Sequence, residues 1–300
     1  MKKNLDTLSL LKGDRLEPSS DLIDVGAFES LPLPTTVVFW RVKNTTMTLH
    51  RNPIFSRALG CTISTIALDM LHILHLGIYK LYCRTVIWLL ILGNAYDVDY
   101  TGREALVELS VRALKVRLHQ WYKAEKLRCP GQPLYEIQEL TPAMLGSNEK
   151  RTLATKGAET GTLLFFCREE AARHMRKLGA AGTHVVKLGN SLCDMLEILR
   201  SSPRVMTPEQ RKALVATAKS AFELRERATV PFVPKWHLVL HLAARAGFSG
   251  NPNFHNTFVD EHWNGELKKS AQGCSRLTWY HRVITAFRYR LAQFRKRMRF

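Results

Sequence analysis

The feature that most constrains the fold of this chain is an apolar segment, residues 68–92, that opens with a carboxylate and two imidazoles. Its apolar side chains recur at the spacing of one helix face, at Leu71, Leu74, Ile78, Leu81 and Tyr82. This periodicity predicts a helix over about residues 69–92. Asp69 suits the N-cap, because its carboxylate accepts hydrogen bonds from free backbone N–H groups of the first turn.

The most apolar stretch of the chain, TVIWLLILG at residues 85–93, lies at the end of this segment. Lys80 and Arg84 precede it, and Asn94 and Asp97 follow it. A helix needs about 20 apolar residues to cross a bilayer. We therefore expect the buried end of a helix here, and no transmembrane segment.

The rest of the chain is predicted to be mainly helical, with a few strands near the N-terminus. TTVVFWRV (35–42) and CTISTIAL (61–68) are strand candidates, because β-branched and aromatic residues concentrate there. Helical patterns cover about 101–127, 157–178, 183–201, 208–227, 235–246 and 276–297. Thr207 is the expected N-cap before Pro208. Residues 134–155 read as a polar connector with two short turns, and 247–254 as a loop.

Positive charge dominates the composition. The chain has 44 Lys and Arg against 26 Asp and Glu, a formal net charge of +18. Such an excess attracts polyanions, which predicts DNA as the partner. The six cysteines are scattered without a C-x-x-C pair, which argues against a zinc ribbon or a secreted disulfide framework. Reduced thiols in a nuclear or cytoplasmic protein are the simpler interpretation.

The last helix carries much of this charge. An apolar stripe on it consists of Val283, Phe287, Leu291, Phe294 and Met298. The candidate nucleic-acid-binding residues cover its remaining faces and are Arg282, Arg288, Arg290, Arg295, Lys296, Arg297 and Arg299. The pattern also fits a solvated helix face or a helix on a membrane surface. The density of arginine favours contact with a phosphate backbone.

Three polar clusters are candidates for chemistry. Asp69 and His72 are one helical turn apart and can point to the same side, although a cap and a buried imidazole would need no further role. His237 and His241 are four residues apart and could hold a metal together with His255, or serve packing alone. Leucine follows His237, so the H-E-x-x-H pattern of zinc proteases is absent.

The third cluster lies in NFHNTFVDEHWNGELKK, residues 253–269. Its acids either favour the positive end of a helix dipole or supply oxygen ligands for Mg²⁺. Glu261 is the candidate ligand, because phosphoryl transfer with two Mg²⁺ ions needs carboxylates that converge from distant segments.

Four segments, in order, resemble motifs of CACTA-type DNA transposases. D-P-x-H-x-x-x-L-G-V-x-K is matched by Asp69, His72, Leu76, Gly77, Ile78 and Lys80. K-A-x-E-x-R-x-F-L-L-Y is matched by Lys156, Ala158, Glu159, Leu163 and Leu164. P-K-x-H-x-L-x-H is matched by Pro234, Lys235, His237, Leu240 and His241. F-E-x-x-N-G-x-L-K is matched by Glu261, Asn264, Gly265, Leu267 and Lys268.

The resemblance implies a partial RNase H-like α/β core over residues 61–270, with a large helical insertion at about 100–230. Residues 1–60 would precede it as an irregular or strand-forming segment, and 271–300 would follow as the basic helix. The family's catalytic acids and Mg²⁺ ligands would correspond to Asp69 and Glu261, with His72, His237 and His241 in supporting roles.

The chain also departs from the family pattern. Only about 68 residues precede Asp69, with Asp14 as a candidate for an earlier acid, and Gly161 stands where the second motif has arginine. The resemblance is therefore to the C-terminal portion of a transposase, in a domesticated or decayed copy. Two functions stay open: a DNA-binding protein with Mg²⁺-dependent phosphodiester cleavage or strand transfer, and a non-catalytic nucleic-acid-binding remnant.

Overall fold

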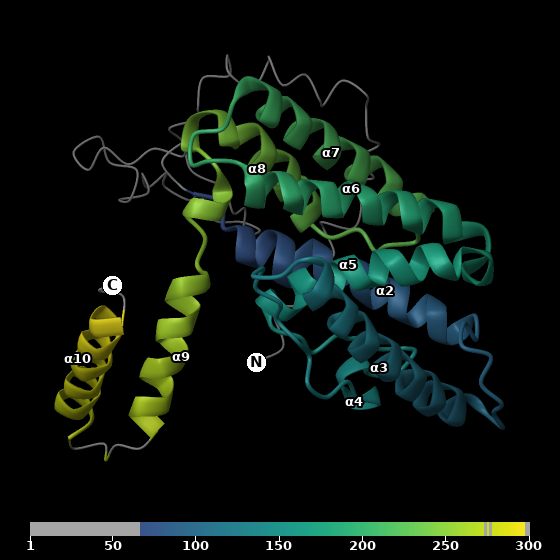
Figure 1. The fold of residues 1–300 in the computed structure, drawn as a ribbon, viewed down its shortest axis with the longest axis horizontal. Helices are drawn as coiled ribbons and strands as arrows, with labels where there is room; N and C mark the ends of the chain where they lie inside the picture. The colour runs from purple at the N-terminus through teal and green to yellow at the C-terminus, as the bar shows by residue number, and fades with distance from the viewer. Residues whose placement is uncertain (1–66, 273–274, 276–277, 298–300) are drawn as a thin grey trace, which may run out of the picture. The chain divides into compact units, whose positions relative to one another are not determined.

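The computed structural model describes residues 67–272, 275 and 278–297 (Figure 1). These residues are mainly helical and contain no strand, so the helical character is confirmed, whereas an RNase H-like α/β core is not shown. Asp14 and the strand candidate at 35–42 lie outside the described residues. The second strand candidate overlaps them only at Ala67 and Leu68, which are coil because they lead directly into the Asp69 cap.

The helices follow the predicted order. Their bounds are η6 (Leu71–Ile78, a π-helix), α2 (Tyr79–Leu92), α3 (Arg103–Arg128), α4 (Pro142–Leu145), α5 (Gly157–Arg173), η7 (Met175–Ala181, a 3₁₀ helix), α6 (Gly182–Ser201), α7 (Pro208–Arg227), α8 (Lys235–Ser249), η8 (Pro252–Phe254, 3₁₀), α9 (Phe258–Gln272) and α10 (Trp279–Arg297). Thr207 caps α7 as predicted, since its side chain accepts from the backbone N–H of Gln210.

The structure differs from the sequence predictions in the connector at 134–155, which contains the short helix α4, and at several helix ends. The helix expected over 157–178 leaves α geometry after Arg173 and continues as η7, where Gly179 has a φ of 67° that ends regular helix. The predicted loop at 247–254 is partly helical, because α8 continues to Ser249 and η8 follows. The buried Asn251 amide donates to the carbonyls of Leu199 and Ser202, which fixes the short link between α8 and η8.

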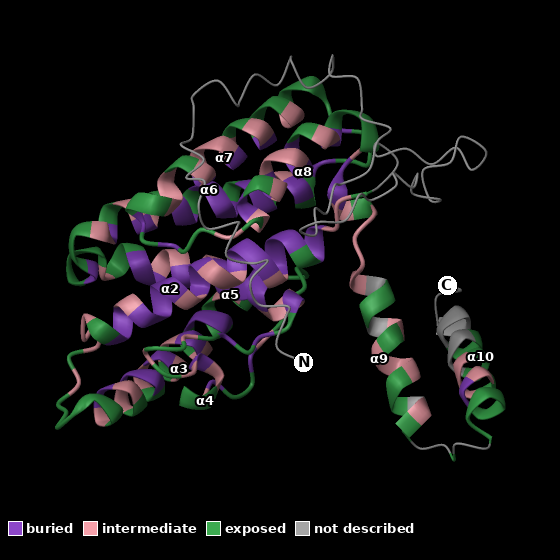
Figure 2. Ribbon diagram, turned by 180° about the vertical axis from the view of Figure 1, so that it is seen from behind, coloured by how far each residue is buried: buried purple, intermediate pink, exposed green. Residues whose placement is uncertain are grey.

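The core forms where η6 and α2, one apolar rod, pack against α5. Along the chain, α5 packs on α6, α6 on α7 and α7 on α8, and α8 returns to η6. Figure 2 shows the resulting concentration of buried residues on α2 and α5. The predicted insertion supplies much of this core, since Phe166 of α5 lies in the same cluster as Trp88 of α2 and Trp236 of α8.

The rod at Leu71–Leu92 is long and apolar enough to cross a membrane, and it is the one such helix among the described residues. However, 72% of its most apolar window is buried inside the protein. The core helix of a globular protein can be equally long and apolar, so the length and composition of the rod are only weak support for a membrane span. The chain is not clearly a transmembrane protein.

The basic helix begins at Trp279 as α10, while α9 runs past the expected boundary at residue 270 to Gln272. The two helices pack on each other, and the ring centroids of Trp263 and Phe287 are 5.4 Å apart in an edge-to-face arrangement. Val283 of the predicted apolar stripe is buried. The stripe therefore begins as expected; the side chains of Leu291, Phe294 and Met298 lie outside the described part of the chain.

Candidate functional site

The four motif segments meet around η6. A Cβ atom on Gly157, at the start of α5, would lie 2.3 Å from Leu71 Cδ1. A Cβ atom on Gly77 would lie 2.7 Å from Lys235 Cδ, at the start of α8. Phe258, at the start of α9, packs edge-to-face on His75 with a centroid separation of 4.9 Å. Three helix N-termini from distant parts of the sequence thus converge on one π-helix.

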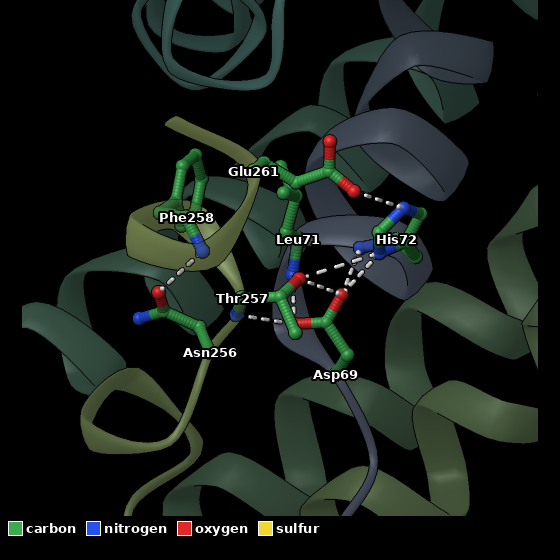
Figure 3. Close-up of polar contacts among 7 residues, drawn as sticks. All are labelled: Asp69, Leu71, His72, Asn256, Thr257, Phe258 and Glu261. Atoms are coloured by element: carbon green, nitrogen blue, oxygen red, sulfur yellow. Dashed lines mark hydrogen bonds and ion pairs between the residues drawn. The ribbon is translucent and has the colours of Figure 1, made fainter. Parts of the chain in front are cut away.

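The Asp69 carboxylate joins the start of η6 to the segment before α9 (Figure 3). Oδ1 accepts the backbone N–H groups of Leu71, at 3.2 Å, and of Thr257, at 2.9 Å. Oδ2 accepts the backbone N–H of His72 at 3.0 Å and the Thr257 hydroxyl at 2.8 Å, and it also contacts His72 Nδ1. A carboxylate offers about four lone-pair sites, so this group is fully engaged within the chain.

His72 stands between the two predicted catalytic acids. Its Nδ1 contacts Asp69, and its Nε2 lies 3.6 Å from Glu261 Oε1 (Figure 3). The side chains of His72 and Glu261 are half exposed, at 50% and 52%. The structure therefore brings Asp69 and Glu261 to opposite edges of one imidazole ring, so that both acids contact the same side chain.

Hydrogen bonding keeps Asp69 charged. Partial burial alone would raise the pKa of this carboxyl group, but hydrogen bonds from His72 and Thr257 outweigh it and lower the pKa below its usual range. Asp69 is consequently anionic at neutral pH and holds its partners as an acceptor only.

The arrangement does not fit the Mg²⁺ site implied by the family resemblance. Mg²⁺ requires oxygen ligands in near-octahedral geometry, and both Asp69 oxygens are already engaged by donors. No group of three or more His, Cys, Asp or Glu side chains that could hold a metal occurs among the residues that the structure describes. Mg²⁺ binding by Asp69 and Glu261 stays a prediction and would require rearrangement of the Thr257 segment.

His237 and His241 form a pair on α8. Their Nε2 atoms are 2.7 Å apart and the rings are nearly perpendicular, so Nε2–H of one ring donates a hydrogen bond to Nε2 of the other. Burial lowers the pKa of His241, and His237 and Arg245 lower it further. Burial also lowers the pKa of His255. Metal binding by these three histidines stays a prediction.

His75 is a residue whose role the sequence analysis missed. Its side chain is 3% exposed, and Nδ1 lies 2.9 Å from the Gly157 carbonyl oxygen. Burial lowers its pKa to about 4, so at neutral pH the ring is uncharged and Nδ1–H donates to that carbonyl. Nε2 is then an acceptor, buried and without a hydrogen-bond partner. Its sequence signature is an imidazole within an otherwise apolar run.

Gly161 explains how His75 fits. A Cβ atom at position 161 would lie 2.6 Å from His75 Cε1 and 3.4 Å from Arg200 Nη2. The 2.6 Å separation is shorter than real Cβ contacts, so a side chain at position 161 would displace the imidazole. The buried His75 ring therefore occupies the space that a side chain at position 161 would need, where the family motif has arginine.

The protonation of His75 predicts acid sensitivity. The folded-state pKa of about 4 lies below the unfolded value of 6.5, so the unfolded chain binds the proton more readily and stability falls as the pH drops through this window. We expect this residue to cost about 2–3 kcal/mol of unfolding free energy between pH 7.5 and 4.5. Urea unfolding of the wild type and of His75→Asn at both pH values measures it. An equal pH dependence in the two proteins would contradict the assignment.

The candidate nucleic-acid-binding residues lie on and after α10. Arg282 and Arg288 are exposed. The helix also includes Arg290, Arg295, Lys296 and Arg297, whose side chains the structure does not describe. Arg299 lies outside the described residues. Trp279, Tyr280 and Tyr289 are exposed on the same helix. Exposed aromatic rings among arginines can stack on the unpaired bases of a single strand, whereas the arginines themselves suit the phosphate backbone of a duplex.

Comparison with protein-family models, with curated proteins and with solved structures finds no match to this chain.

Proposed function

We propose that this chain is a DNA-binding protein derived from a CACTA-type transposase, in which Asp69, His72 and Glu261 act mainly as a structural joint. The convergence of the four motif segments on η6 supports this proposal most strongly. These segments are spread over residues 69–268, and a shared packing centre gives a physical reason for them to occur together.

The charge distribution supports DNA as the partner. α10 contains six Lys or Arg residues and no acidic residue, and exposed aromatic rings lie among them. Each Lys or Arg that neutralises a phosphate releases counterions, which favours binding at low salt. Duplex binding through this helix would not depend on base sequence.

The geometry of Asp69 supports a binding role over strand cleavage. Its oxygens accept donors from both η6 and the Thr257 segment, so the carboxylate already serves to hold α9 in place. A catalytic carboxylate in two-metal phosphoryl transfer needs free oxygens directed at the ions.

Mg²⁺-dependent cleavage or strand transfer is the second candidate function. One observation favours it, because carboxylates 192 positions apart meet at a single imidazole and one of them, Glu261, is half exposed. A shift of the Thr257 segment would free an Asp69 oxygen beside Glu261. Glu261→Gln separates the two functions, since it removes the acid and leaves the Asp69 bonds intact.

The expected result is salt-sensitive, sequence-tolerant binding to duplex DNA. We expect fluorescence anisotropy with two unrelated duplexes to give similar affinities, and log K to fall linearly with log salt concentration. Substituting Arg282→Ala and Arg288→Ala together should reduce the magnitude of that slope by about 2, because two phosphate contacts are lost.

A matched variant controls for net charge. Lys212→Ala with Arg227→Ala removes two exposed charges from α7, and its slope should stay near the wild-type value. Equal effects of the two double variants would assign binding to overall charge rather than to α10. Adding Mg²⁺ or Mn²⁺ to the same complexes tests the second candidate: cleavage lost in Glu261→Gln would support it, and no cleavage by the wild type would exclude it.

A further inference from the structure

A cavity of about 1000 Å³ lies between α3, the connector after it, α5 and α6. Aromatic and cationic side chains line it, including Tyr135, Phe165, Phe258, Arg168, Arg200 and His75. Glu125 and Glu197 also line it. Ligand pockets typically have about 300–1000 Å³ and combine apolar walls with a few placed polar groups. The cavity is thus large enough for a nucleotide-sized molecule.

Arg200 is the cation in this cavity that is available to a ligand. Its Cζ lies 5.7 Å from the ring centroid of Phe165, and Glu197 acts on it electrostatically. Among the described residues, no side chain is within hydrogen-bond or ion-pair distance of its guanidinium. The other cations have ion-pair partners: Lys126 lies 2.6 Å from Glu136, Arg128 contacts Glu125 and Glu169, and Arg168 Nη2 lies 3.7 Å from Glu169. An unpaired guanidinium in a cavity favours a phosphate or carboxylate group.

His75 supplies a second recognition group at the same end of the cavity. Both His75 and Arg200 flank Gly161, which has no side chain to separate them. Nε2 of the neutral ring lacks a donor, and a buried polar atom without a partner is costly. Phe258 packs on this ring and also lines the cavity. Because Nε2 is buried, a ligand in the cavity would contact it only after the Phe258 side chain moves aside.

We propose that this cavity binds a nucleoside monophosphate, whose phosphate pairs with Arg200 and whose ribose hydroxyl or base N–H donates to His75 Nε2. The half-exposed ring of Tyr135 and the ring of Phe165 offer apolar faces for the base and sugar. The phosphate thus matches the cation Arg200, the hydrogen-bond donor matches the acceptor His75 Nε2, and the flat base matches the aromatic rings. This site does not depend on DNA binding by α10.

Calorimetric titration of the full chain at pH 7.5 tests the proposal with AMP, adenosine and inorganic phosphate. AMP should bind at least about tenfold more tightly than either half, because each half leaves one recognition group unpaired. Arg200→Met should weaken AMP binding by roughly 10- to 100-fold and leave adenosine binding unchanged. His75→Asn retains an amide donor for the Gly157 carbonyl but removes the Nε2 acceptor, and should weaken AMP binding by about 2- to 10-fold.

Lys126→Met is the matched control, because it removes one positive charge from the same cavity at a side chain that already has an ion-pair partner. Its AMP affinity should change less than about threefold. The proposal fails if AMP does not bind at millimolar concentration, if inorganic phosphate binds as tightly as AMP, or if Lys126→Met and Arg200→Met lose equal affinity. Thermal unfolding shows whether each variant is folded. If His75→Asn is unfolded, the comparison of Arg200→Met with Lys126→Met decides the outcome. DNA is absent from these titrations, so their failure leaves the proposed function untouched.

Discussion

Replacing Asp69 with alanine should lower the free energy of unfolding by about 3–5 kcal/mol, because it removes an N-cap and the bonds that hold Thr257. Hydrogen bonds to a charged group contribute about 1.5–3 kcal/mol each, and a lost cap costs about 1 kcal/mol. Denaturant unfolding measures the change. Hydrogen exchange at residues 257–261 should rise more than exchange in α6, because the loss is local to the joint.

Thr257→Val is the graded control for this joint. It removes the hydroxyl that donates to Asp69 Oδ2 and leaves the backbone N–H that donates to Oδ1. A loss of about 1–2 kcal/mol is expected. If Asp69→Ala costs less than the threonine variant, the carboxylate does not carry the connection, and a role in binding an ion becomes the better account of its position.

The second large effect is expected at Glu170, the buried acid of α5. Its side chain is 1% exposed, and its carboxylate accepts from Arg117 at 3.0 Å and from the Tyr96 hydroxyl at 3.1 Å. Arg173 and His174 lie 3.2 and 3.6 Å away. Glu170→Ala should lower the free energy of unfolding by about 3–5 kcal/mol, because it leaves the charges of Arg117 and Arg173 without their carboxylate partner.

An exposed ion pair provides the comparison for Glu170. Glu139 pairs with Lys115, and its side chain is 73% exposed. Glu139→Ala should lower the stability far less than Glu170→Ala does, because solvent screens the exposed pair. Urea unfolding of both variants at one salt concentration gives the contrast. Similar losses from the two substitutions would mean that burial does not set the strength of the Glu170 network.

The helices could be predicted from sequence because each carries a strong local pattern. α7 combines Thr207, Pro208 and Gln210 in a capping box, and its observed start agrees with that pattern. The π geometry of η6 could not be predicted, since its apolar spacing is equally compatible with an α-helix. It occurs where α5, α8 and α9 all approach this segment, so tertiary contacts accompany it.

The candidate site was only partly predictable for the same reason. Asp69 and His72 are three residues apart, and local spacing was enough to place them together. Thr257 lies 188 positions from Asp69, and no local pattern marks its hydroxyl as a partner. Glu261 is linked to Asp69 in the sequence only through the family resemblance, and no local pattern marks its contact with His72. Arg200 was missed because its significance depends on the glycine and imidazole beside it.

The return of α8 to η6 has a consequence for synthesis of the chain. η6 begins at Leu71 and α8 begins at Lys235, so the ribosome must add more than 160 residues before this contact can form. At about 5–20 residues per second, this interval lasts on the order of 10 s. During it, the apolar surface of the rod at Leu71–Leu92 has only part of its final cover. Nascent chains that stop between α6 and α8 should therefore engage chaperones more strongly than complete ones.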